Sequence, residues 1–284
     1  MLQLHHGVNR IAKRLAIHAA AKLPSGVKAF LHRHRHLDRI SRLWFRALLG
    51  PGEVTIEAGP LCGWRLASSE HISHAHVRGV YEREVQEAIA RIVKPGWICY
   101  DLGASIGYLS LVMVKAGARR VYAFEPAPHA AEEIRRNFQA NGVDNYTIVA
   151  NPVSDSIRPV RFGITDVAYG SAIAYSPTRW PTIEVMTVTL EAFVKEHEFP
   201  DFVKIDVEGE EEKVLEGARS ILAERRTIFC IEVHTFEDAV QTKRILEEYG
   251  YRVTSLSGEE FVISSEIKAG NVQVLAWPAE VRRS

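Results

Sequence analysis

The sequence is poor in cysteine. Cys62, Cys99 and Cys230 are the three in 284 residues, and none forms a Cys-x-x-Cys pair. Such an odd, sparse set gives no disulfide framework and no structural zinc site. Cys99 and Cys230 lie in apolar runs, which predicts buried and inert thiols. We therefore expect a cytoplasmic protein, because thiols stay reduced in that compartment.

Long apolar runs and an excess charge of one sign are also missing. No run approaches the roughly 18 apolar residues of a membrane span, and the N-terminus lacks the pattern of a secretory signal. Lys and Arg number 35 and so do Asp and Glu, so a generally basic nucleic-acid-binding protein is not the default. With 46% apolar and 25% charged residues, the composition is that of a globular chain.

The charge is unevenly distributed along the chain. Residues 1–50 hold ten Lys or Arg and one acid, Asp38, so this basic front segment carries +9 and the rest carries −9. We expect this segment to dock on the acidic remainder of its own chain, or on that of a second chain in a homo-oligomer. A more specific alternative is that it contacts a membrane surface or an anionic glycan. Six histidines in this segment could bind metal adventitiously, but their irregular spacing specifies no site: His5, His6, His18, His32, His34 and His36.

Residues 1–78 predict an extension ahead of a more regular domain. Helical spacing and turn residues predict helices over 8–23 and about 27–49, and a hairpin with strands over 53–58 and 64–67. We therefore divide the chain into a basic helical and hairpin extension, residues 1–78, and a second domain, residues 79–284.

From Gly79 onward, strand-like and helix-like stretches alternate, which predicts βαβ units and a parallel sheet covered on both faces. The expected strands are 97–102, 120–125, 146–150, 202–206, 228–233 and 251–256, and the expected helices are 108–116, 129–141, 190–197, 210–222 and 236–249. An inserted β segment is expected over 160–164, 171–175 and 183–188, and a last antiparallel strand over 272–277 after a hairpin from 260–263. The fold class is thus α/β, with a Rossmann-like, doubly wound, mostly parallel seven-stranded sheet.

One loop between a strand and a helix is especially informative: Asp101-Leu102-Gly103-Ala104-Ser105-Ile106-Gly107. Ligands of open α/β sheets bind at the carboxyl ends of the strands. Gly103 would let a ligand approach the backbone, and Gly107 would let the helix pack tightly. The next strand ends at Glu125, where an acid can hold both hydroxyls of a ribose. A tight turn with a capping acid is the structural alternative, but the combination favours a nucleoside-type cofactor.

Two signatures of nicotinamide enzymes are missing. The Gly-x-Gly-x-x-Gly spacing is absent, and Asp101 would repel a pyrophosphate at this loop. No tyrosine has a lysine four residues on, so the Tyr-x-x-x-Lys pair is absent too. A cationic cofactor with an amino-acid tail fits better. S-adenosyl-L-methionine carries a sulfonium and an ammonium group, and we expect it as the cofactor.

Three segments resemble the hallmarks of FkbM-type methyltransferases, which have the class I S-adenosylmethionine-dependent fold. They are residues 101–108, Phe124-Glu125-Pro126 and Val203-Lys204-Ile205-Asp206-Val207-Glu208-Gly209-Glu210. Supporting matches are Gly79-Val80-Tyr81-Glu82, Val153-Ser154-Asp155 and Ile231-Glu232-Val233-His234. The resemblance covers about residues 79–257 and implies a methyltransferase domain.

The resemblance also implies contacts with the cofactor. The implied residues are Asp101, Gly103, Ala104 and Gly107 at the methionine and ribose end, Glu125 on the ribose, Asn151 at the adenine, and Glu82 ahead of the core. Asn151-Pro152 imitates the Asn-Pro-Pro-aromatic motif of amino-directed nucleic-acid methyltransferases. That motif belongs at the end of the fourth strand, where Asp206 and Glu208 stand instead.

Four further groups follow two adjacent strands. Asp206 and Glu208 follow the fourth strand, and Glu232 and His234 end the fifth. Residues two apart on a strand share a face, so these groups can converge. Helix capping and a satisfied buried histidine are the structural alternatives, but four converging groups favour a catalytic site.

His234 is the natural general base, because the ordinary pKa of histidine lies near neutral pH. Asp206 or Glu208 could substitute if crowding raises a carboxylate pKa. A divalent cation such as Mg²⁺, held by Asp206, Glu208 and Glu232, is the less favoured route.

The sequence therefore predicts an S-adenosylmethionine-dependent O-methyltransferase. The resemblance implies a hydroxyl of a sugar, glycan or secondary metabolite as acceptor, and we expect no nucleic acid as partner. A nucleic-acid methyltransferase that uses the basic front segment as a clamp is one alternative, which the missing motif and the acidic core disfavour. A non-catalytic binding module on the same fold is another, which the acidic cluster disfavours.

Overall fold

The computed structural model describes residues 50–165, 172–173, 180–263 and 272–279. The helices expected over 8–23 and about 27–49, and with them the basic front segment and its histidines, lie outside the described residues. Among the residues described, no helix is both long and apolar enough to span a membrane.

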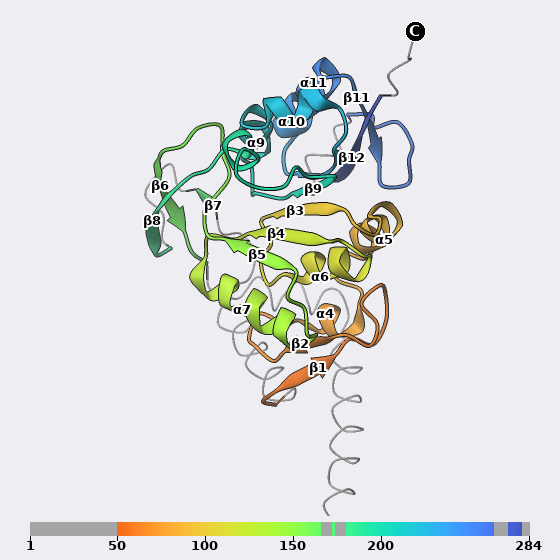
Figure 1. Ribbon diagram of the computed structural model, residues 1–284, viewed down its shortest axis with the longest axis vertical. Helices are drawn as coiled ribbons and strands as arrows, with labels where there is room; N and C mark the ends of the chain where they lie inside the picture. The colour runs from red at the N-terminus through yellow and green to blue at the C-terminus, as the bar shows by residue number, and fades with distance from the viewer. Residues whose placement is uncertain (1–49, 166–171, 174–179, 264–271, 280–284) are drawn as a thin grey trace, which may run out of the picture.

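A seven-stranded sheet forms the centre of the molecule, with helices on both faces (Figure 1). Its strands are β3 (Ile98–Leu102), β4 (Arg120–Phe124), β5 (Tyr146–Val149), β9 (Phe202–Ile205), β10 (Ile228–Val233), β11 (Tyr251–Ser255) and β12 (Val272–Pro278). Their order is β11-β12-β10-β9-β3-β4-β5, and β12 runs antiparallel to both of its neighbours. The predicted fold class is confirmed, and every strand lies within one residue of its predicted bounds.

The hairpin expected from 260–263 is wrong in part. Glu260 forms only an isolated antiparallel bridge with Thr254 of β11, and Phe261 N–H donates to the carbonyl of Val253 at 3.1 Å. This segment therefore pairs antiparallel with β11, while β12 is held between β11 and β10.

The central strands are predictable because both of their faces are buried. Every residue of β3 and β9 is buried, so each strand shows a continuous, mostly apolar run instead of alternating apolar and polar residues. Cys99 and Cys230 are buried free thiols in this sheet, as predicted, whereas Cys62 is exposed.

Helices α5 (Arg83–Ile92), α6 (Tyr108–Lys115) and α7 (Pro128–Gln139) share one apolar cluster on one face of the sheet. Helices α8 (Leu190–Phe193), α9 (Glu211–Glu216), α10 (Arg219–Glu224) and α11 (Phe236–Glu248) contribute to a second cluster on the other face. Helix α5 and the short α4 (His74–Arg78) were not predicted.

The single helix expected over 210–222 is two helices, α9 and α10. A Cβ at Gly217 would lie 2.2 Å from the carbonyl oxygen of Ser154, so the chain needs glycine at this approach. The carbonyl of Gly217 also accepts from Glu191 N–H at 2.8 Å, so the short segment between α9 and α10 contacts the start of α8.

The predicted N-terminal hairpin is confirmed as β1 (Glu53–Thr55) and β2 (Arg65–Ala67). Two asparagines bind the outer edge of β2, Asn137 within α7 and Asn141 just after it. Asn137 Oδ1 accepts from Ala67 N–H at 2.8 Å, and Asn141 Oδ1 accepts from Arg65 N–H at 2.8 Å. Residues 56, 61, 66, 72 and 77 belong to the same apolar cluster as α5 to α7. The described part of the extension thus packs into the main core, and the domain boundary at residue 78 stays a prediction.

The inserted β segment forms a separate small sheet of β6 (Pro159–Gly163), β7 (Ala172–Ile173) and β8 (Thr182–Met186) (Figure 1). Phe162 of β6 packs with Ala127 and Ala130, at the start of α7. The small sheet therefore stands beside the carboxyl end of β4, next to the expected cofactor loop.

Candidate functional site

The loop after β3 needs glycine at two positions, for two different reasons. Gly103 has φ 77°, and a Cβ there would lie 1.9 Å from the carbonyl oxygen of Asp206. Glycine at position 103 is therefore required by the close approach of the chain after β9. The close approach of a ligand to the Gly103 backbone stays a prediction. A Cβ at Gly107 would lie 3.1 Å from the ring of Phe138 in α7, so the predicted tight helix packing is confirmed.

Glu125 holds this loop from the end of β4. One of its oxygens accepts from Ser105 N–H and the other from Ala127 N–H, both at 2.9 Å. Its side chain is buried, and burial raises its pKa to about 7 despite these two hydrogen bonds. Each carboxylate oxygen keeps further acceptor capacity for a ligand in the adjoining cleft. Binding of a ribose by Glu125 stays a prediction.

Two cavities meet beside Glu125. The first, of about 560 Å³ and partly open to solvent, is lined by the predicted residues Glu82, Asp101, Gly103, Ala104 and Glu125. The second, of about 430 Å³, is lined by the predicted Asn151 together with Pro126, Pro152, Val153, Phe162 and Ile173. Both share Gly103, Glu125 and Asp206, so they lie side by side, and we call the pair the cofactor cleft.

The second cavity suits a flat aromatic base. Asn151 Nδ2 donates to the carbonyl of Met186 at 2.8 Å, which fixes the amide with its oxygen available as an acceptor. The carbonyl of Pro152 accepts from Val188 N–H at 3.0 Å, which ties this turn to the chain after β8. An adenine at Asn151 stays a prediction that this lining supports.

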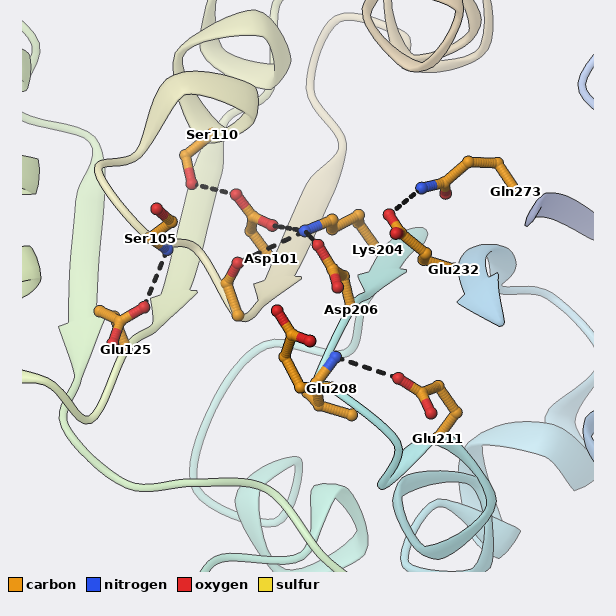
Figure 2. A network of polar contacts seen from close by, with 12 residues as sticks. Asp101, Ser105, Ser110, Glu125, Lys204, Asp206, Glu208, Glu211, Glu232 and Gln273 are labelled. Carbon is orange, nitrogen blue, oxygen red and sulfur yellow. Dashed lines mark hydrogen bonds and ion pairs between the residues drawn. The ribbon is translucent and has the colours of Figure 1, made fainter. Parts of the chain in front are cut away.

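A buried lysine crosses the floor of the cleft, and sequence reasoning assigned it no role. Lys204 Nζ lies 3.0 Å from Asp206 Oδ2, 3.7 Å from Asp101 Oδ1 and 3.4 Å from the carbonyl of Gly103 (Figure 2). Burial alone would lower the pKa of Lys204, but Asp206, Asp101 and Glu82 raise it well above its usual value. The negative charge of Asp101 is therefore balanced within the protein. The sequence did hold a signal for Lys204, because a lysine stands there inside an otherwise apolar strand.

Aromatic side chains close the other side of the cleft, and these too were missed. The rings of His76 and Tyr81 lie 4.1 Å apart, and Tyr108 lies 5.2 Å from His76. Burial lowers the pKa of His76 to about 3, so this imidazole is neutral. Glu82 lies beside them with φ 43°, and its buried Oε2 makes no hydrogen bond within the described chain. The cleft thus offers a neutral aromatic wall and an acceptor oxygen.

The four groups predicted for the acceptor side do converge, and we call them the acceptor cluster: Asp206, Glu208, Glu232 and His234. His234 Nε2 lies 3.5 Å from Asp206 Oδ1, 3.7 Å from Glu208 Oε2 and 3.7 Å from Glu232 Oε1. The ligand atoms of Asp206, Glu232 and His234 lie within 4.8 Å of one another, close enough to share a cation. The catalytic roles of the four stay predictions.

Glu211, which was not singled out from the sequence, organises this cluster. Its fully buried carboxylate lies 3.1 Å from His234 Nδ1, and Oε1 also accepts from the N–H groups of Val207 and Gly209 at 3.2 Å. It thereby fixes both the loop after β9 and the imidazole at the end of β10.

The charge state of His234 differs from the expectation. Burial lowers its pKa, but Glu211, Asp206 and Glu208 outweigh burial and raise it to about 9. At neutral pH, without another cation nearby, the protonated form of the imidazole is therefore favoured. The pKa of His234 is higher than the ordinary value on which the prediction of a general base rested, and that role stays a prediction.

Comparison with known proteins identifies a family and several relatives. The family profile described as "Methyltransferase FkbM domain" matches residues 101–253, more than half of the chain. The chain is 25% identical over 197 residues to the hexuronic acid methyltransferase AglP of Haloferax volcanii, covering 64% of this chain and 76% of that protein. It is 35% identical over 132 residues to the ribosomal protein L11 methyltransferase of Caldanaerobacter subterraneus subsp. tengcongensis, covering 46% of this chain and 38% of that protein. A solved structure of methyltransferase FkbM from Methylobacillus flagellatus KT aligns with a TM-score of 0.47 at 15% identity, covering 72% of this chain and 56% of that one.

Proposed function

The chain belongs to the FkbM methyltransferase family and is an S-adenosylmethionine-dependent methyltransferase, and we propose that it methylates a hydroxyl oxygen of a sugar. One relative bears the name of a hexuronic acid methyltransferase, which supports a sugar acceptor. The acceptor cluster is rich in carboxylates, so a carboxylate of the acceptor would be repelled there. We therefore propose that a ring hydroxyl, and not an acidic group, enters the cluster.

The single observation that carries this proposal is the position of Asp206. Its Oδ2 contacts Lys204 on the floor of the cofactor cleft, while its Oδ1 faces His234 in the acceptor cluster. The two sites therefore share one side chain. An acceptor bound at the cluster lies next to the cofactor, and such positioning is the main contribution that an enzyme makes to a displacement reaction.

The residues present fit S-adenosylmethionine, which when bound supplies an electrophilic methyl group. Glu125 would hold the ribose hydroxyls, and Asn151 would accept from the adenine amine. Glu82 would take the ammonium group, since its buried Oε2 makes no hydrogen bond among the described residues. The aromatic wall of His76, Tyr81 and Tyr108 would exclude water from the sulfonium end, and the acceptor cluster would take the proton of the hydroxyl.

The test uses the full chain, S-adenosylmethionine labelled in its methyl group, and separate acceptor pools: neutral sugars, uronic acids, RNA and ribosomal protein. We expect label on a sugar hydroxyl, with one equivalent of S-adenosylhomocysteine released per methyl. We expect Asp206→Asn to lose that transfer, while Glu224→Gln, an exposed carboxylate on α10, keeps it. Label on RNA or protein, and none on any sugar, would overturn the proposal.

A further inference from the structure

We propose that Asp206, Glu232 and His234 form a binding site for a divalent metal cation of the Mn²⁺ type. The metal-facing atoms would be Asp206 Oδ1, Glu232 Oε1 and His234 Nε2. Glu208 would add a ligand at the open edge, since its Oε2 lies 3.7 Å from the same imidazole nitrogen.

The first argument is that the second polar atom of each ligand is already held by the protein. Asp206 Oδ2 is bound by Lys204 at 3.0 Å, and Glu232 Oε2 accepts from Gln273 Nε2 (Figure 2). His234 Nδ1 lies 3.1 Å from the buried carboxylate of Glu211. One ligand atom from each of the three groups lies within 4.8 Å of the other two. A carboxylate behind a histidine, and hydrogen bonds behind carboxylate ligands, are the outer contacts that orient metal ligands in proteins.

The second argument is the spacing of the facing atoms. The distances of 3.5 Å and 3.7 Å from His234 Nε2 to Asp206 and Glu232 exceed the roughly 2.7–3.2 Å of an N–H···O hydrogen bond. Ligands about 2.1–2.3 Å from a metal lie about 3.0–3.8 Å apart between right-angled and tetrahedral positions. The observed separations fall inside that interval. His234 Nε2 is also buried and makes no hydrogen bond within the described part of the chain.

The third argument concerns the kind of cation. Two or three carboxylates and one imidazole form a mainly hard donor set with a single borderline ligand. That set suits Mn²⁺ better than soft metals, which prefer thiolates. The two buried thiols, Cys99 and Cys230, are not among the groups that can share a metal in the described residues. Positive charge at this point would also offset the carboxylates that surround it.

The metal would have a function in the proposed reaction, and this part of the inference rests on the proposed function. A hydroxyl coordinated to a divalent cation has a lower pKa. The acceptor O–H would lose its proton to the oxygen of Glu208 that does not contact the metal, and the acceptor oxygen would form the new C–O bond with the methyl carbon. The C–S bond would break, leaving its electron pair on sulfur.

The experiment measures metal binding apart from activity. The full chain is stripped with a chelator and titrated with Mn²⁺, and free Mn²⁺ is followed by electron paramagnetic resonance. We expect Asp206→Asn and Glu232→Gln to weaken one site per chain by about 100-fold or more. Glu211→Gln should weaken it by about 10–100-fold, because its carboxylate orients His234. Glu224→Gln should bind as the wild type does.

Calorimetry with S-adenosylhomocysteine on the same samples shows whether each variant is folded. Mn²⁺ held by histidines of the basic front segment would persist in Glu232→Gln, so the difference from wild type isolates the proposed site. Wild type that binds no Mn²⁺, or Glu232→Gln that binds it equally well, would overturn the metal site. If the wild type does not bind S-adenosylhomocysteine, that result would instead count against the proposed function.

Discussion

The cofactor cleft and the acceptor cluster differ in how their charges are compensated, although both lie at the end of β9. In the cleft, the buried ammonium of Lys204 lies between Asp101 and Asp206. In the cluster, the carboxylates of Asp206, Glu208, Glu232 and Glu211 surround a single imidazole at 3.1–3.7 Å. The comparison teaches that the buried Asp101 of the cleft has an ammonium partner within the chain, whereas the cluster has one imidazole among four carboxylates, retains an excess of negative charge and gains from a further cation.

The largest expected effect lies in the cluster. His234→Ala should lower turnover by about 10²–10⁴-fold, the range typical for losing a group that handles a proton or orients the acceptor. Affinity for S-adenosylhomocysteine should stay within about twofold of wild type, because His234 does not line the cofactor cleft. Steady-state kinetics and calorimetry measure the two quantities. Unchanged turnover would contradict a role of His234 at the acceptor site, and with it the functional distinction between the acceptor cluster and the cofactor cleft.

The next largest effect is expected in the cleft and concerns stability. Lys204→Met should lower the free energy of unfolding by about 3–5 kcal/mol, because it leaves buried carboxylates without their ammonium partner. Chemical denaturation measures this change. Lys195→Met is the matched control, since Lys195 is exposed and its loss should cost less than about 0.5 kcal/mol. Equal stability of the two variants would contradict the assigned role of Lys204 in charge compensation.

A smaller effect separates cofactor binding from the fold. Glu125→Ala should weaken the binding of S-adenosylhomocysteine by about 1–3 kcal/mol, the scale of charge-assisted hydrogen bonds to a ribose. The exposed Glu132→Ala, on the helix that follows, serves as control and should bind normally. Calorimetry measures both affinities. If Glu125→Ala binds as tightly as the control does, the ribose is held elsewhere.

The smallest effect is a pH dependence in the cleft. The pKa of Glu125 is about 7, raised by burial, so its ionised form becomes dominant only above neutral pH. Ribose hydroxyls donate to the ionised form, so affinity for S-adenosylhomocysteine should rise with pH up to about 7 and then level off. The rise should approach tenfold per pH unit well below that pKa. Glu125→Gln should remove this part of the profile, and an identical profile in the variant would exclude Glu125 as its source.

The sequence by itself determined the sheet and the place of the cofactor cleft. The strands were predictable to within one residue, and for β3 and β9 the reason is that every residue is buried, which gives each strand a mostly apolar run. The loop from Asp101 to Gly107 and the acid Glu125 were recognisable because they are local in sequence. The convergence of Asp206 and His234 also followed from adjacent strands, since parallel strands end at the same edge of a sheet.

Only the tertiary structure decided the partners and charge states of these residues. Glu211 holds His234 from another element, and Asp206 contacts Lys204 on one side and His234 on the other. Contacts between segments far apart in sequence fix the pKa of His234 near 9, which spacing along the chain does not reveal. A contact between distant segments also explains why position 103 must be glycine, since a Cβ there would clash with the carbonyl of Asp206. A local pattern specifies which groups reach the site, but their electrostatics depend on every neighbour that folding brings beside them.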